Sequence, residues 1–269
     1  MDLKRVLTSV IGLPLVIAVL ILGNKYVVDV LFMLVAIICM REYFYVTEKV
    51  AHPMKIVGYL STIIIALVSI FSEKTIMEIL LFGIPIIMLI LFTKVIITNM
   101  KTTFKDVAYT LVGIFYITFF IMFLSFIRGL DNGLIILGYT LIIAWSTDIF
   151  AYLTGKKIGK HKFSKVSPKK TIEGCVGGII GAVVVGLIYT YIISVYYDLG
   201  ISNIYLWAIP VSAILSIISQ IGDFTASSIK RFADVKDYGN LLPGHGGMLD
   251  RIDSVIFIAP FVYMIFFYL

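Results

Sequence analysis

Residues 175–197 read CVGGIIGAVVVGLIYTYIISVYY, an apolar run without a single charged side chain. An α-helix needs about 20 such residues to cross a hydrocarbon core of roughly 30 Å. Small residues recur at four-residue intervals along this run, at Gly174, Gly178, Ala182 and Gly186. Such a stripe lets a neighbouring helix approach closely. The run therefore predicts a transmembrane helix packed against another helix, either in the same chain or in a second copy as a homodimer.

Apolar blocks of similar length fill most of the remaining sequence. Hydrophobic residues make up 60% of the 269 residues and charged residues only 14%, whereas a soluble domain carries roughly 25% charged residues. We therefore predict an all-α, polytopic transmembrane helical bundle of about nine spans, forming one integral membrane domain over residues 1–269. The first block has no small-residue cleavage site after it, so we expect an uncleaved first span. The other eight predicted spans are about 6–22, 26–44, 56–72, 76–97, 107–127, 134–153, 204–222 and 252–268.

The distribution of basic residues orients these spans. Of the 22 lysines and arginines, 19 fall in the segments that nine spans place on the side of the N-terminus, and three fall on the other side. Cytoplasmic segments carry the excess of Lys and Arg. We therefore expect the N-terminus in the cytoplasm, the C-terminus outside and the chain in the cell (inner, cytoplasmic) membrane. The net charge is +6, and the basic residues lie between apolar blocks. This arrangement favours the lipid bilayer and phosphorylated substrates as partners over nucleic acid.

The two longest polar segments, at about 154–174 and 223–251, both lie on the predicted cytoplasmic side. We expect the active site there, with residues 1–130 mainly as scaffold and 134–269 carrying the catalytic spans and loops. Asp148 is an acidic residue within a span, where a lipid-facing carboxylate costs about 2.5–3.5 kcal/mol. It therefore points to a polar cavity, a cation or a partner, although pairing with Lys156 or Lys157 at the interface is an alternative.

The first polar segment ends on a combination that suits phosphate. Lys169, Lys170 and Thr171 precede a predicted helix, whose first backbone N–H groups carry partial positive charge. Two cations, a hydroxyl and a helix N-terminus are the parts of a phosphate cradle. The alternative is that these lysines serve only the orientation of the chain in the membrane.

The second polar segment combines carboxylates with cations and glycines. Asp223 and Ser227 share one helical face, and Asp250 and Asp253 share another. Gly246 and Gly247 lie in the loop between them and allow backbone N–H groups to approach an anion. Such a set matches what Mg²⁺-dependent phosphoryl or nucleotidyl transfer requires. The alternative is a salt-bridged loop that only closes two helix ends.

Two stretches resemble the phosphatidate cytidylyltransferase (CDP-diacylglycerol synthase) family. Residues 227–253 read SSIKRFADVKDYGNLLPGHGGMLDRID, and residues 148–174 read DIFAYLTGKKIGKHKFSKVSPKKTIEG. The resemblance implies transfer of CMP from CTP to phosphatidate, giving CDP-diacylglycerol and pyrophosphate with Mg²⁺. Because a phosphate monoester has a second pKa near 6, phosphatidate at neutral pH is already a nucleophile, and the site must chiefly neutralise charge.

The resemblance also implies roles for individual residues. Asp223 and Asp250 would bind one or two cations directly, with Asp148 and Asp253 supporting them. Lys169, Lys170 and Thr171 would hold the triphosphate or the departing pyrophosphate. Lys230, Arg231 and Arg251 would take the phosphatidate headgroup. His245, Gly246 and Gly247 would meet the nucleotide phosphates, although His245 can instead protonate the pyrophosphate or brace the loop. The remaining predicted substrate-binding residues are Ser227, Lys236 and Asp237.

Two other classes of protein fit parts of the pattern. A lipid kinase that uses CTP to phosphorylate a polyprenol has a similar build but releases CDP instead of pyrophosphate. A transporter with Asp148 and Asp223 as ion-coupling residues is the second alternative. Transporters usually show repeated halves with broken helices at mid-membrane, and no such repeat is visible in this sequence.

Overall fold

The computed structural model describes residues 14–71, 76–164, 166–197, 200, 203–241 and 246–268, with the side chains of 71 and 76–80 left out. The chain divides into two compact units. Unit 1 comprises Met1–Ser125 and Phe232–Arg251, and unit 2 comprises Phe126–Arg231 and Ile252–Leu269. The second polar segment of the sequence therefore folds largely with the predicted scaffold spans.

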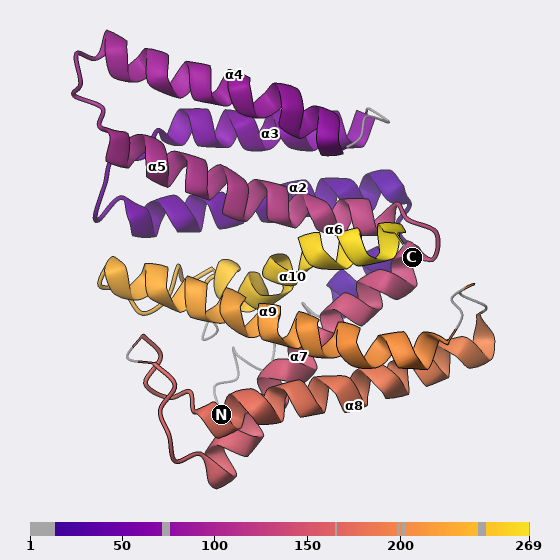
Figure 1. The fold of residues 1–269 in the computed structure, drawn as a ribbon. Coiled ribbons are helices and arrows are strands. Elements are labelled where there is room, and N and C mark those ends of the chain that lie inside the picture. Colours follow the sequence, from indigo (N-terminus) through magenta and orange to yellow (C-terminus); the bar gives the residue numbers. More distant parts are fainter. Residues whose placement is uncertain are drawn as a thin grey trace. The chain divides into compact units, whose positions relative to one another are not determined.

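The described part of the chain is helical and contains no strand, which confirms the all-α prediction (Figure 1). Each predicted span has a helical counterpart there, including 76–97, which is found as Ile76–Ile97. Residues 14–22 are also helical. The further helices are α2 (Lys25–Thr47), α3 (Lys55–Phe71), α4 (Ile76–Ile97), α5 (Phe104–Gly113), η1 (Ile114–Phe119), α6 (Phe120–Arg128), α7 (Gly133–Ile158), α8 (Ile172–Tyr196), α9 (Ile204–Phe232) and α10 (Leu249–Tyr268).

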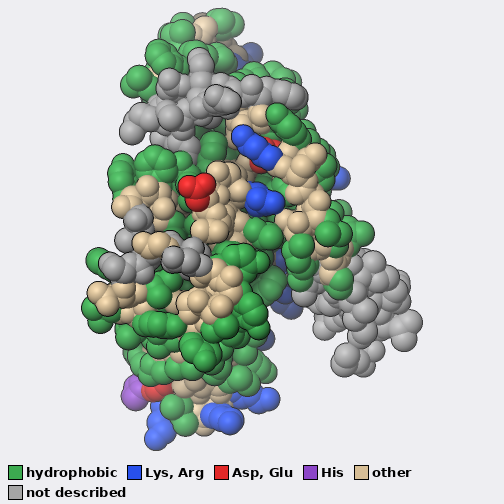
Figure 2. Space-filling model, turned by 90° about the vertical axis from the view of Figure 1, so that its right-hand side faces the viewer, with side chains coloured by type: hydrophobic (Ala, Val, Ile, Leu, Met, Phe, Trp, Pro, Cys, Tyr) green, Lys and Arg blue, Asp and Glu red, His purple; other side chains and the backbone are tan. Residues whose placement is uncertain are grey.

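Among the residues that the structure describes, five helical segments are long and apolar enough to cross a membrane, and two shorter apolar helices lie at Lys55–Ile70 and Leu81–Ile97. Hydrophobic side chains also cover most of the face drawn in Figure 2. A protein with several such helices is an integral membrane protein. The count of nine crossings and the orientation of the termini stay predictions. The five segments are Phe104–Arg128, Gly133–Ile158, Ile172–Tyr196, Ile204–Phe232 and Leu249–Tyr268.

Unit 1 is built on α2, α3 and the rod formed by α5, η1 and α6. Thr103 and Asp106 cap the start of this rod through reciprocal hydrogen bonds, which satisfies backbone donors that the helix leaves open. The Tyr43 hydroxyl on α2 donates a hydrogen bond of 3.0 Å to the Tyr109 carbonyl, and Thr62 meets Thr118 at 2.7 Å between hydroxyl oxygens. The rod is therefore joined by hydrogen bonds to α2 through Tyr109 and to α3 through Thr118.

Unit 2 is organised by the small-residue stripe of α8, which packs along α7. A Cβ on Gly178 would lie 3.0 Å from the Thr147 carbonyl oxygen and 3.1 Å from the Ala151 Cβ. A Cβ on Gly186 would lie 2.2 Å from the Ser212 hydroxyl of α9. The stripe therefore serves contacts within the chain, one of its two predicted uses, and the homodimer stays a prediction.

Candidate active site

The loop between α7 and α8 in unit 2 is folded back on itself. Lys162 and Thr171 form an isolated antiparallel bridge, and the Phe163 amide donates to the Lys170 carbonyl at 3.1 Å. The Thr171 side chain accepts the Gly174 amide at 3.1 Å and is 5% exposed. Thr171 is therefore the N-cap of α8, and its predicted contact with phosphate stays a prediction.

Glu173, in the first turn of α8, clamps this loop. Its carboxylate accepts the Lys160 amide at 3.1 Å, the His161 amide at 3.3 Å and lies 2.6 Å from the His161 Nδ1 atom. These contacts fix the start of the loop, and the bridge at Thr171 fixes its end. The loop therefore presents Lys170 from a defined backbone. The sequence analysis gave Glu173 no role.

Lys170 meets the carboxylate of Asp223 in an ion pair, with its ammonium 4.5 Å from the centre of the Phe224 ring. Both side chains are about a quarter exposed. Burial lowers the pKa of Lys170, while the negative charges of Asp148 and Asp253 act in the opposite direction. The structure therefore brings four predicted site residues of unit 2 into one electrostatic neighbourhood.

The two other carboxylates of this neighbourhood come from α7 and α10. Asp253 is 7% exposed, and its Oδ1 atom accepts the Ser254 amide at 2.8 Å. Asp148 is on the exposed side of α7, and the Ser254 side chain also reaches it. No three carboxylate, thiol or imidazole groups among the described residues are spaced to hold a metal ion. Lys170 forms its ion pair with Asp223 and lies close enough to Asp148 and Asp253 for their charges to act on its ammonium.

Helix α9 carries its polar residues on one uninterrupted rod that extends ten residues beyond the predicted span, to Phe232. Asp223, Ser227, Lys230 and Arg231 therefore belong to one helix, as predicted. The Gln220 side chain donates to the Cys175 carbonyl at 3.2 Å and ties α9 to α8. A cavity of about 390 Å³ lies beside this contact and is lined mainly by α8, α9 and the loop around Phe163.

The segment before α10 forms the polar part of unit 1. The Oδ2 atom of Asp250 accepts the Tyr238 amide at 2.8 Å and the Gly247 amide at 2.9 Å. Gly246 has a φ of +83°, a conformation that a residue with a Cβ rarely adopts. Asp250 thus holds both ends of its own loop. His245 lies outside the described residues, and the exposed members of the predicted site here are Lys236, Asp237 and Arg251.

Unit 1 also contains a buried acidic residue beside the predicted site that the sequence analysis did not name. Glu42 of α2 is 7% exposed and accepts the backbone amides of Met248 and Leu249, immediately before Asp250. No local pattern signals this contact, because its partners lie 206 and 207 residues further along the chain. The only feature of the sequence that could have drawn attention to Glu42 is that it is an acidic residue near the end of an apolar block.

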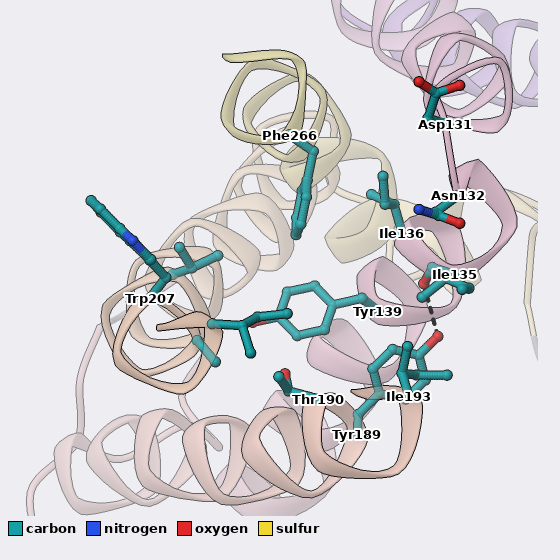
Figure 3. A pocket seen from close by; sticks show the side chains of 13 residues that line it. Asp131, Asn132, Ile135, Ile136, Tyr139, Tyr189, Thr190, Ile193, Trp207 and Phe266 are labelled. Atoms are coloured by element: carbon teal, nitrogen blue, oxygen red, sulfur yellow. Dashed lines mark hydrogen bonds between the residues drawn. The ribbon is translucent and has the colours of Figure 1, made fainter. Parts of the chain in front are cut away.

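A different cavity, of about 240 Å³, lies at the start of α7 and the end of α8 (Figure 3). Tyr139 points into its centre, and the Tyr189 hydroxyl donates to the Ile135 carbonyl at 2.8 Å. Asp131 is the only charged residue among those that line it. An aromatic cavity with a negative charge at its edge does not suit a phosphorylated substrate, so the Lys170 end of unit 2 is the better candidate for the active site.

Comparison with known proteins agrees with this chemistry. The chain matches the model of the Cytidylyltransferase family over residues 3–269. It therefore belongs to the Cytidylyltransferase family and is a nucleotidyltransferase embedded in a membrane. Its similarity to phosphatidate cytidylyltransferases confirms the resemblance seen in the sequence.

Three of these relatives give the extent of the match. The phosphatidate cytidylyltransferase of Bacillus subtilis (strain 168) is 40% identical over 191 residues, which is 70% of this chain and 67% of the relative. That of Staphylococcus haemolyticus is 32% identical over 259 residues, or 95% of each chain. That of Thermotoga maritima is 36% identical over 181 residues, or 66% of this chain and 65% of the relative.

Proposed function

We propose that this protein transfers CMP from CTP to phosphatidate, releasing pyrophosphate and forming CDP-diacylglycerol for phospholipid synthesis. The observation that carries the proposal is the grouping of Lys170 with Asp223, Asp148 and Asp253 at one end of unit 2. Relatives that share 95% of the chain's length carry the name phosphatidate cytidylyltransferase. The Lys170 ammonium and the N-terminus of α8 beside it are suited to phosphate oxygens, and the three carboxylates would suit a cation that accompanies the phosphates.

The chain's own residues supply charge and position. Lys170 sits on a fixed loop at the start of α8, where its ammonium can move from Asp223 to a phosphate oxygen of CTP. Lys169 is exposed beside it and adds a second positive charge. Lys230 and Arg231 at the end of α9 would hold the phosphatidate headgroup, together with Arg251. Phosphatidate enters as a dianion, so a strong general base is not needed.

Carboxylate oxygens are the ligands that Mg²⁺ prefers, so the acidic residues around Lys170 are of the right chemical type for this ion. Binding it would require the Lys170 ammonium to leave Asp223 and the carboxylates to move closer together than they are in the structure. Asp223 and Asp250 would hold Mg²⁺, with Asp148 and Asp253 completing the site and a second cation of unassigned identity beside it. When bound, the ion would neutralise phosphate charge.

We place the site on the cytoplasmic side of the cell membrane, in a nine-span chain whose N-terminus is cytoplasmic and whose C-terminus is outside. The excess of lysine and arginine in the segments around 154–174 and 223–251 supports this orientation. CTP would then reach the site from the cytoplasm, and phosphatidate would reach it from the inner leaflet.

The proposal is tested by measuring where the α-phosphate of CTP goes and which by-product is released. Purified protein is given CTP labelled at the α-phosphate, together with phosphatidate and Mg²⁺. We expect the label in a lipid product and one pyrophosphate for each lipid formed. Release of CDP with transfer of the γ-phosphate would identify a lipid kinase and refute the proposal, and so would the absence of any labelled lipid from a folded preparation.

A further inference from the structure

The turn that leads into α10 is held by a carboxylate from a different part of the chain. The Oε1 atom of Glu42 accepts the Met248 amide at 2.9 Å, and its Oε2 atom accepts the Leu249 amide at 2.8 Å. Leu249 is the first residue of α10. The first backbone N–H groups of a helix have no partner within it, and a negative charge at this end is favourable. Glu42 therefore acts as the cap of α10.

Asp250 completes the same turn from inside the helix. Its Oδ2 atom accepts the Gly247 amide at 2.9 Å. Three consecutive amides, at Gly247, Met248 and Leu249, thus donate to two carboxylates, one from α2 and one from α10 itself. The orientation of the Asp250 carboxylate depends on the path of this turn, and Glu42 fixes that path.

Two positions beside the Glu42 carboxylate are so closely packed that they suit only glycine. A Cβ on Gly247 would lie 2.5 Å from the Glu42 Oε2 atom, and a Cβ on Gly239 would lie 3.0 Å from Oε1. Both glycines belong to the stretch that resembles cytidylyltransferases. The absence of side chains there is explained by the approach of Glu42.

The burial of Glu42 distinguishes it from an ordinary surface acid. A buried carboxylate is costly unless it is hydrogen-bonded or paired, and Glu42 is 7% exposed with Asp250 close enough to oppose its charge. A residue that only stabilised α2 would not need a charge here. We propose that Glu42 is a positioning residue, which holds the 247–249 turn so that Asp250 is presented to the phosphate-bearing substrates. The effect of this role on catalysis rests on the proposed function.

The test compares Glu42→Gln with Glu48→Gln. Glu48 ends the same helix, but it is exposed and pairs with Lys55 at 2.6 Å, so the control makes the same chemical change outside the turn. An amide at position 42 would direct an N–H group toward a backbone N–H. We expect kcat to fall by about 10- to 100-fold, the range for residues that support a site indirectly, and the Mg²⁺ concentration for half-maximal activity to rise. Glu48→Gln should stay within about twofold of the unmodified protein.

Hydrogen exchange of peptides covering 246–250 supplies a readout that does not depend on activity. We expect these amides to exchange faster in Glu42→Gln and at the original rate in Glu48→Gln. Unchanged exchange together with unchanged kcat in folded Glu42→Gln would overturn the proposal, as would an equal loss in Glu48→Gln. If the unmodified protein forms no CDP-diacylglycerol, the proposed function fails, while the exchange measurement still decides whether Glu42 holds the turn.

Gly239→Ala keeps the proposal testable if Glu42→Gln does not fold, because Gly239 lies beside Glu42 and has no assigned contact with a substrate. Its Cβ would lie 3.0 Å from the Glu42 Oε1 atom and would push on the carboxylate. We therefore expect a lower kcat and faster exchange of the 246–250 amides with Glu42 intact. Unchanged kcat together with unchanged exchange in folded Gly239→Ala would overturn the proposal.

Discussion

Gly174→Ala adds one methyl group where α7 and α8 meet with backbone against backbone. The new Cβ would lie 2.8 Å from the Ala151 carbonyl oxygen, 3.0 Å from the Thr171 hydroxyl and 3.2 Å from the Gly155 Cα. Two of these neighbours are backbone atoms, which cannot move aside as the end of a flexible side chain can. The helices must therefore separate at the point where the Lys170 loop joins α8.

The magnitude follows from two opposing effects. Overpacking in a well-packed interior costs about 1–3 kcal/mol, and replacing glycine by alanine within a helix returns about 0.5–1 kcal/mol. Because two of the neighbours are backbone atoms, we take the upper part of the overpacking range, about 2–3 kcal/mol. The net destabilisation is then about 1–2.5 kcal/mol, which lowers the unfolding temperature by roughly 2–10 °C in a protein of this size. We also expect a higher KM for CTP, because the displaced helix start carries Lys170.

Thermal unfolding in detergent measures the effect, with Gly83→Ala as its control. Gly83 lies within α4, where no described atom comes within 4 Å of the added Cβ, so this variant should unfold at the same or a higher temperature. A Gly174→Ala protein that is as stable as the original would refute the close α7–α8 packing.

Two further predictions concern the Lys170 loop. The double variant Lys169→Ala, Lys170→Ala should chiefly raise the KM for CTP, by about tenfold or more. Lys170→Ala alone should account for most of this rise, because Lys169 is exposed and Lys170 is held against Asp223. An unchanged KM would mean that both lysines serve only to orient the chain in the membrane. Glu173→Gln should loosen the loop at His161, seen as faster proteolysis near residue 161 and a raised KM for CTP, and unchanged cleavage would show that the clamp is dispensable.

The sequence predicted the helices well because hydrophobic length alone decides them. A span needs about 20 apolar residues, and the predicted 76–97 and 204–222 were both found, the second as the first part of α9. The stripe of α8 predicted a close helix contact, but only the structure shows that α7 and α9 are its partners. The π-helical turn of η1 left no sign in the apolar pattern.

Members of the candidate site could be chosen from the sequence where each belongs to a local pattern, but their contacts could not be predicted. Asp223 and Lys170 were each chosen from the residues around them, and only the structure shows the ion pair between them. Glu42 was missed because its partners lie more than 200 residues away, and no periodicity records such a contact. The contact of Thr171 with phosphate stays a prediction, and the structure adds that its side chain caps α8, which the sequence analysis did not predict.

The central claim is that acidic groups of α9 and α10 allow one phosphate to attack another. It is tested most directly by measuring the incorporation of labelled CMP into lipid with Asp223→Asn and with Asp250→Asn, each shown to be folded by its unfolding temperature. The account predicts that both variants lose turnover while remaining folded in detergent. Incorporation at the original rate in both variants would contradict it.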